Sequence, residues 1–251
     1  MSGPTPPTDM QGWMREVDKR LSRLDRRSSG NKEPRGTTAE RNQAFWVPAN
    51  DAERAALANE KVVWFNTDLG WWESYYATTG TAGLTAKGLV AGTAPGWYPV
   101  GLGPYIRLEP GTTFAATPNN PIRSWAGLRN DRNGGSAWFT YTDADGRITV
   151  PRAGRYLVRA QTVQQTGTGT SNFHLRQLNA NAYERHVDGV ATPLNSTLFT
   201  LAHAEAEFPA PAGRQFDLYV QSGTLNVHSG GSTGIRGEFL VRYMGPLLVS
   251  D

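Results

Sequence analysis

Residues 145–158 read DGRITVPRAGRYLV and give the clearest indication of the fold. Apolar and polar residues alternate over 147–150 and again from Tyr156 onward, which is the period of a strand with one buried face. Turn residues lie before the first run, at Asp145-Gly146, and between the runs, at Arg152-Ala153-Gly154. The stretch therefore predicts two consecutive strands joined as a hairpin.

The same alternation of apolar and polar residues, interrupted by turn residues, continues on both sides of this stretch, from about Tyr105 to the end of the chain. Further alternating runs lie at 172–175, 215–221 and 238–244, separated by turns such as Pro211-Ala212-Gly213. No helical period is visible after residue 105. Eight to ten strands of this kind predict a mainly β domain at 101–251, a two-sheet sandwich and most simply a jelly roll.

The stretch at 145–158 resembles the G-x-apolar-x-x-P-x-x-G-x-Y pattern of the complement-globular-head and tumour-necrosis-factor jelly-roll superfamily. The resemblance extends over about residues 105–246 through a strand and asparagine at 173–179, a turn and strand at 211–220 and a closing strand at 237–241. It implies a compact trimer of jelly rolls that binds other molecules and performs no chemistry. It also implies a broad apolar-aromatic sheet face buried around a threefold axis.

The first 43 residues are expected to attach and trimerise the protein. Residues 1–9 are rich in Pro and Thr and are predicted to be disordered, and residues 31–43 are predicted to be a polar linker. Between them, about residues 10–27, a helix is predicted by a heptad seam. The seam consists of Met10, Met14, Val17, Leu21 and Leu24. Two interpretations remain open, a helix packed on its own domain and a short self-associating coiled coil, and the flanking polar segments favour the coiled coil.

Residues 44–100 predict a small β-rich connector module with many aromatic residues. A short helix is expected from Asp51, as N-cap, to Glu60, followed by a hairpin over 62–76 with its turn at 66–70. So many aromatic side chains in so short a segment are expected to need neighbouring copies or a partner surface for burial.

The first hundred residues resemble minor tail or fibre proteins of phages that infect actinobacteria. The resemblance rests on an ordered set: the heptad helix, the polar linker, Trp64-Phe65-Asn66-Thr67-Asp68-Leu69-Gly70 and the motif APGWYPVG at 94–101. It implies a structural virion protein, made in the host cytoplasm and located on the exterior of the tail or capsid. Its expected partners are further copies of itself, other virion proteins and a host-surface glycan or receptor.

Composition excludes several other classes of protein. The 25 basic and 22 acidic residues nearly balance, so no nucleic-acid partner is expected. The absence of cysteine excludes disulfides, thiolate metal sites and cysteine nucleophiles. No apolar run is long enough for membrane insertion, and the N-terminus lacks the layout of a secretory signal.

The motifs that are similar to catalytic or metal-binding sites are incomplete in this sequence. The G-x-S-x-G match at 230–234 is not followed by a helical pattern, and the four histidines show neither H-E-x-x-H nor H-x-H spacing. Asp143-Ala144-Asp145-Gly146 is similar to the opening of a calcium loop but lacks the remaining ligands, which favours a turn. We therefore expect no enzyme, no catalytic residue, no cofactor and no metal.

The candidate ligand-binding residues are predicted to lie in long polar loops of the head, at 164–171, 186–196 and 228–233. Their hydroxyl and amide groups suit carbohydrate recognition, although such segments can simply be solvated. The residues are Gln164, Gln165, Thr168, Thr170, His186, Asn195, His228 and Ser232. The expected function is a homotrimeric minor tail or fibre protein that binds the host surface. The alternatives are a capsid head-fibre or decoration protein, and an accessory module of a carbohydrate-active enzyme or a bacterial ligand-binding module.

Overall fold

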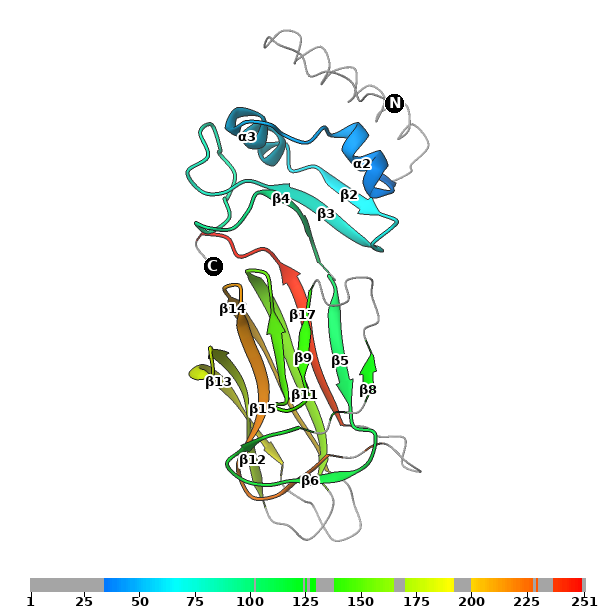
Figure 1. Cartoon of the computed structure of the whole chain (residues 1–251), viewed down its shortest axis with the longest axis vertical. Coiled ribbons are helices and arrows are strands. Elements are labelled where there is room, and N and C mark those ends of the chain that lie inside the picture. The colour runs from blue at the N-terminus through cyan, green and yellow to red at the C-terminus, as the bar shows by residue number, and fades with distance from the viewer. Residues whose placement is uncertain are drawn as a thin grey trace.

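The structure is a computed structural model that describes residues 34–101, 103–123, 125, 127–129, 138–164, 170–191, 200–227, 229 and 237–249. It is elongated, with the small N-terminal connector stacked on one end of a long β-sandwich (Figure 1). The predicted heptad seam, Met10 to Leu24, lies outside the described residues. Within them, neither helix has the length and apolar character needed to cross a membrane.

The connector is a four-stranded sheet covered by two short helices. The sheet order is β1-β2-β3-β4. The strands are β1 (Arg35–Gly36), β2 (Val63–Asn66), β3 (Trp71–Tyr76) and β4 (Gly96–Pro99), and the helices are α2 (Thr38–Ala44) and α3 (Asp51–Asn59). Strands β2 and β3 pair antiparallel across the turn that follows Asn66, which confirms the predicted hairpin.

Two predictions for this region need correction. The polar linker expected at 31–43 is wrong over 35–43, because β1 pairs parallel with β2 and α2 follows at once. The second helix is confirmed at α3, but its N-cap is Asn50 rather than Asp51, since the Asn50 side chain accepts a hydrogen bond from the Glu53 amide at 3.0 Å.

Helix α2 begins at a capping box. The Thr37 hydroxyl accepts from the Glu40 amide at 3.1 Å, and the Glu40 carboxylate accepts from the Thr37 amide at 2.8 Å. Replacing Thr37 by Ala is expected to lower the free energy of unfolding by about 1 kcal/mol, because one amide of the first turn loses its acceptor. Urea denaturation measures this loss, and Thr37→Ser, which keeps the hydroxyl, is the control. An alanine variant as stable as the serine variant would contradict it.

The connector has a core of its own. Phe45, Trp64 and Tyr75 pack with Leu57 and Ala58 of α3, all of them buried. The Phe45 and Trp64 rings meet edge to face with centroids 6.0 Å apart. For these aromatic residues the expected need for neighbouring copies or a partner surface is wrong, because α2 and α3 cover this face of the sheet within the same chain. Trp71 and Tyr98 are buried against another surface, that of the sandwich.

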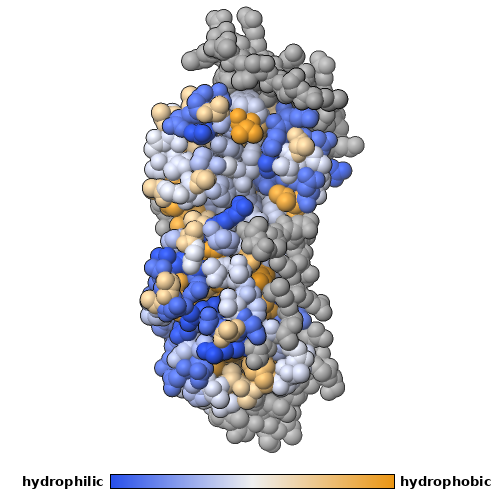
Figure 2. All heavy atoms as spheres, viewed as in Figure 1, coloured by the Kyte–Doolittle hydropathy of each residue, from blue (hydrophilic) through white to orange (hydrophobic). Residues whose placement is uncertain are grey.

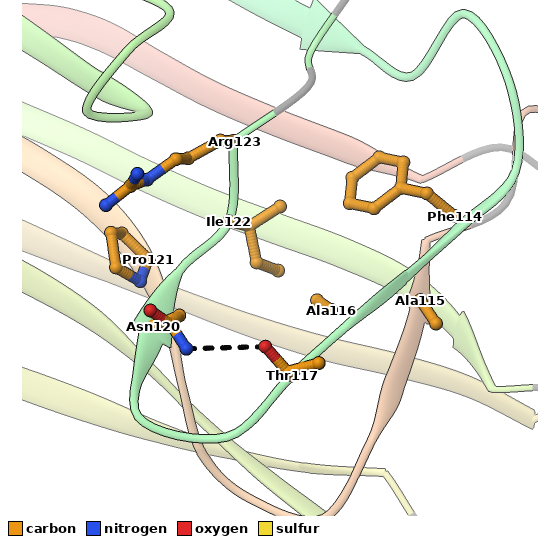
Figure 3. A pocket seen from close by; sticks show the side chains of 8 residues that line it. All are labelled: Phe114, Ala115, Ala116, Thr117, Asn120, Pro121, Ile122 and Arg123. Atoms are coloured by element: carbon orange, nitrogen blue, oxygen red, sulfur yellow. Dashed lines mark hydrogen bonds between the residues drawn. The ribbon is translucent and has the colours of Figure 1, made fainter.

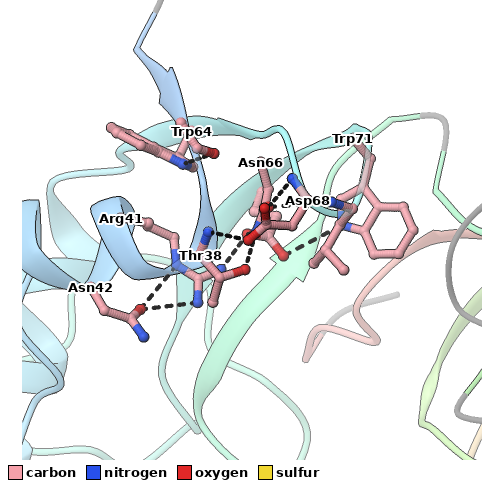
Figure 4. Close-up of polar contacts among 10 residues, drawn as sticks. Thr38, Arg41, Asn42, Trp64, Asn66, Asp68 and Trp71 are labelled. Atoms are coloured by element: carbon pink, nitrogen blue, oxygen red, sulfur yellow. Dashed lines mark hydrogen bonds and ion pairs between the residues drawn. The ribbon is translucent and has the colours of Figure 1, made fainter.

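A buried polar cluster ties α2 to this sheet (Figure 4). Arg41 of α2 forms an ion pair with Glu73 of β3, and both side chains are almost wholly buried. The Glu73 carboxylate also accepts from Asn66 Nδ2 at 2.9 Å and from Trp71 Nε1 at 3.3 Å. Asn66 Nδ2 donates in turn to the Thr38 hydroxyl at 2.9 Å. Both charges are thus compensated inside the connector.

The C-terminal part is a sandwich of two antiparallel sheets, which confirms the predicted fold class. One sheet has the order β14-β11-β17-β5-β8, and the other has the order β13-β12-β15-β10-β9 with β7 beside β15. Strands of the first sheet are β5 (Tyr105–Glu109), β8 (Gly127–Arg129), β11 (Gly154–Gln164), β14 (Thr200–Ala210) and β17 (Glu238–Gly245). Those of the second are β7 (Asn120–Pro121), β9 (Thr140–Thr142), β10 (Arg147–Val150), β12 (Ser171–Asn179), β13 (Ala182–Ala191) and β15 (Arg214–Ser222). A short pair, β6 (Phe114–Ala116) and β16 (Leu225–Val227), lies apart from both sheets.

The sandwich core consists of alternate residues from both sheets. Tyr156 and Val158 of β11 are fully buried, as are Phe173 of β12 and Phe216 of β15. The Tyr156 and Phe216 rings meet across the two layers with centroids 6.0 Å apart. The alternation read from the sequence therefore reports the buried face of each strand correctly.

The pairing predicted from residues 145–158 is wrong. Strand β10 pairs with β9 and β15, whereas β11 pairs with β14 and β17, so the two strands lie in different layers. The chain changes layer between Pro151 and Gly154. A Cβ on Gly154 would lie 2.3 Å from the Tyr243 ring, so this corner needs glycine. The turn Asp143–Gly146 does form a hairpin, between β9 and β10.

The connector and the sandwich share one core. Trp71, Leu89 and Tyr98 of the connector belong to the same buried cluster as the sandwich residues. Trp71 packs on Trp138 with centroids 5.9 Å apart, and Leu89 forms a β-bridge with Leu248 beyond β17. The last described residues of the head are thus held by the connector, and a boundary at residue 100 divides a continuous core.

The broad apolar-aromatic outer face implied by the resemblance is not found among the described residues. On the sheet that contains β17, the half-buried Arg107 and Arg159 both pair with the buried Glu238, whose carboxylate lies 2.8 Å from Arg107 Nε. The other sheet exposes charged residues and histidines, described below. Hydrophilic residues predominate on the face of the described residues that Figure 2 shows, because the apolar residues of each strand alternate inward.

Candidate functional site

Three of the eight predicted ligand-binding residues lie in the described part of the chain. Thr170 is exposed directly before β12, Gln164 ends β11, and His186 lies within β13. The prediction of a loop at His186 is therefore wrong, because β13 continues to Ala191. The others, Gln165, Thr168, Asn195, His228 and Ser232, lie outside the described residues.

A recess of about 270 Å³ lies beside β6 and β7 (Figure 3). Phe114 and Ile122 supply its apolar side chains, and Arg123 points away from Phe114. The Asn120 amide donates to the Thr117 hydroxyl at 3.3 Å and to the Pro118 carbonyl at 3.0 Å. The side-chain amide of Asn120 is thus already hydrogen-bonded within the chain, and we assign no ligand to the recess.

A denser group of functional side chains covers the outer face of the sheet that contains β12, β13 and β15. Arg176 of β12 makes a two-pronged contact with Asp217 of β15, with distances of 2.8 and 2.6 Å. Asp217 is completely buried, and Arg147 Nε lies 3.7 Å from it. The Arg176 guanidinium also lies 3.6 Å above the Tyr219 ring. These contacts fix the position and compensate the charge of Arg176.

Two histidines and an aspartate lie next to this ion pair. His174 of β12 is the direct register partner of Asp188 of β13, and His186 precedes Asp188 by two residues on the same face. The Nε2 atoms of both histidines lie 3.1 Å from the same Asp188 oxygen, Oδ1. The two imidazole rings stack with centroids 4.3 Å apart. The Tyr183 hydroxyl contacts His186 Nδ1.

The electrostatics of this His–His–Asp cluster favour neutral imidazole at His174. Desolvation by burial is the largest influence and lowers its pKa below 6.5, and His186 and Arg176 lower it further, whereas Asp188 raises it. A neutral imidazole offers one unprotonated nitrogen to a ligand. The cluster can therefore accept hydrogen bonds or coordinate a cation.

Sequence reasoning nominated His186 but missed Tyr183, His174 and Asp188. The spacing of His186 and Asp188 was a usable signal, since residues two apart on a strand share a face. The position of His174 depends on the β12–β13 register, which the sequence pattern does not specify. A Cβ on Gly189 would lie 2.2 Å from the Phe173 ring, so glycine permits the close packing of the two strands beside the cluster.

No protein-family model matches this sequence, and no curated protein matches it. Solved structures do match. The Eiger tumour necrosis factor of S. frugiperda is 14% identical, with 55% of this chain and 90% of that chain covered and a TM-score of 0.44. The globular domain of zebrafish complement 1qA is 13% identical, with 57% and 96% covered and a TM-score of 0.37. Murine APRIL at pH 5.0 is 11% identical, with 56% and 98% covered and a TM-score of 0.42.

Proposed function

We propose that the chain is a homotrimeric, non-enzymatic structural protein of a bacteriophage virion, of the minor tail or fibre type. Its sandwich binds a host-surface glycan, and its N-terminal segment attaches it to the particle. The observation that carries this proposal is the arrangement of the described parts. A two-sheet head of jelly-roll strand order is fused through a shared core to a connector at the N-terminal side.

The positions of the connector and of the strand ends support a separation of attachment from ligand binding. The connector pairs with the segment after β17, so it occupies the end of the sandwich where β11 begins and β17 ends (Figure 1). The C-terminal ends of β11 and β13, which lead into the candidate binding segments, lie at the opposite end (Figure 1). A ligand-binding end and an attachment end are thus separated by the length of the head.

Trimer formation rests on the heptad seam at residues 10–24 and on the superfamily resemblance. Light scattering on the full chain is expected to give three times the chain mass. Charged substitutions at Val17 and Leu21 are expected to weaken the assembly, because a buried charge in each helix of a seam is costly. A monomeric full chain would overturn the trimer.

The functional test separates cell binding from incorporation into particles. A chain that begins at residue 34 keeps the connector and the head and is expected to bind host cells but not to join virions. The Val17 and Leu21 variants of the full chain should show the same separation. Normal incorporation of the shortened chain would contradict N-terminal attachment, and absence of cell binding would contradict the receptor-binding head. If imaging of labelled protein on intact particles places it on the capsid, a head fibre or decoration protein is favoured. Release of oligosaccharides from host glycan by the protein would overturn the non-enzymatic assignment.

A further inference from the structure

We propose that His174, His186 and Asp188 form a binding site for a divalent transition-metal ion of the zinc class on the outer face of the sandwich. One nitrogen or oxygen atom from each residue can serve as a ligand, and these atoms all lie within 4.8 Å of one another. Two imidazoles and one carboxylate are a ligand set that zinc takes in proteins. The site does not depend on the virion function proposed above.

The three ligands come from two strands that are held in fixed register. His186 and Asp188 lie two residues apart on β13, and His174 lies opposite Asp188 on β12. Both Nε2 atoms already converge on Asp188 Oδ1. An ion bound among these three atoms needs only a small spreading of the side chains, because Asp188 is 68% exposed and has room to move.

The surroundings of the ligands suit a bound cation. The Tyr183 hydroxyl contacts His186 Nδ1, which leaves Nε2 on the side of Asp188. When Nε2 binds the ion, the imidazole proton resides on Nδ1 and is donated to the Tyr183 oxygen, a contact that orients the ring. Arg176, the nearest fixed positive charge on β12, is paired with the buried Asp217 and does not occupy Asp188.

Three protein ligands leave one position of a tetrahedral ion unfilled. That position faces solvent, since His186 and Asp188 are both exposed on the outer surface of β13. An open position of this kind takes water or an oxygen ligand from a bound molecule. Any such ligand would approach the face of the sheet rather than the segments at its distal end.

The test is calorimetric titration of zinc chloride into the full chain, prepared without a histidine tag and cleared of metal. One ion per chain is expected. His174→Ala and His186→Ala are each expected to weaken binding by more than about 100-fold, and Tyr183→Phe by about tenfold, because a hydrogen bond that orients a ligating imidazole contributes that much to metal affinity. His203→Ala is the matched control, since His203 is an exposed strand histidine beside Glu205 on the other sheet.

Cobalt provides an independent readout at the same site. Cobalt bound by the full chain is expected to give the visible absorption of a four-coordinate ion, which His174→Ala and the exposed-site variant Asp188→Asn should abolish. With metal removed by a chelator, each variant is expected to melt at the same temperature as the unsubstituted chain, which shows that the variant is folded. Absence of zinc binding by the full chain, or binding that survives both histidine substitutions, overturns the site. Equal weakening in His203→Ala does so as well.

Discussion

Replacing Glu73 by Ala is expected to lower the free energy of unfolding by about 3–5 kcal/mol, the usual result of removing one partner of a buried ion pair. The Arg41 guanidinium would stay buried without its carboxylate. Asn66 Nδ2 and Trp71 Nε1 would lose the same acceptor, at 2.9 and 3.3 Å. The cost is therefore that of one uncompensated charge together with weakened hydrogen bonds around it.

Urea denaturation followed by tryptophan fluorescence measures this effect. Asp51→Ala is the matched control, because Asp51 also pairs with an arginine, Arg54 at 2.8 Å, but its side chain is 60% exposed. The control is expected to lose less than about 1 kcal/mol. The double variant Arg41→Met, Glu73→Leu is expected to regain much of the lost stability, because it buries no charge. A Glu73→Ala protein as stable as the Asp51→Ala protein would show that the ion pair does not hold the connector together.

The sequence pattern predicted the strands better than their partners. The alternation at 147–150 and 156–160 identifies the buried side chains of β10 and β11, because burial follows the period of the strand. It does not reveal that Pro151 to Gly154 form a corner between two sheets. That outcome depends on Tyr243, which lies close to Gly154 from a strand some ninety residues away in the sequence.

The sequence of the connector contains a signal for the start of α2 that an apolar period alone does not reveal. Thr37 and Glu40 have the spacing of a capping box, so the start of α2 was predictable despite the lack of an apolar period. The partner of Arg41 was not predictable, since Glu73 lies on β3, 32 residues away in the sequence. The proximity of His174 and Asp188 was not predictable for the same reason, since only the register of β12 with β13 brings the two residues together.

Removing residues 34–43 is expected to cost as much stability as Glu73→Ala or more. A chain that begins at residue 44 lacks β1, most of α2 and Arg41, so Glu73 loses its cation and the sheet loses part of its cover. It also lacks the Thr38 hydroxyl that accepts from Asn66, and Trp64 loses the Gly36 carbonyl that its ring nitrogen contacts at 3.2 Å. The chain that begins at residue 34 keeps all of these groups and is the reference.

Thermal melting and urea denaturation of the two shortened chains measure the difference, which is expected to be at least about 3–5 kcal/mol. The effect should reach the head, because Trp71 packs on Trp138 in the shared core and Leu89 bridges to Leu248. A deletion of residues 1–43 that fails to enter virions would therefore report a damaged connector as well as a missing attachment segment. Equal stability of the two chains would show that β1 and α2 are dispensable, and would place the functional boundary at residue 44 as the sequence pattern first indicated.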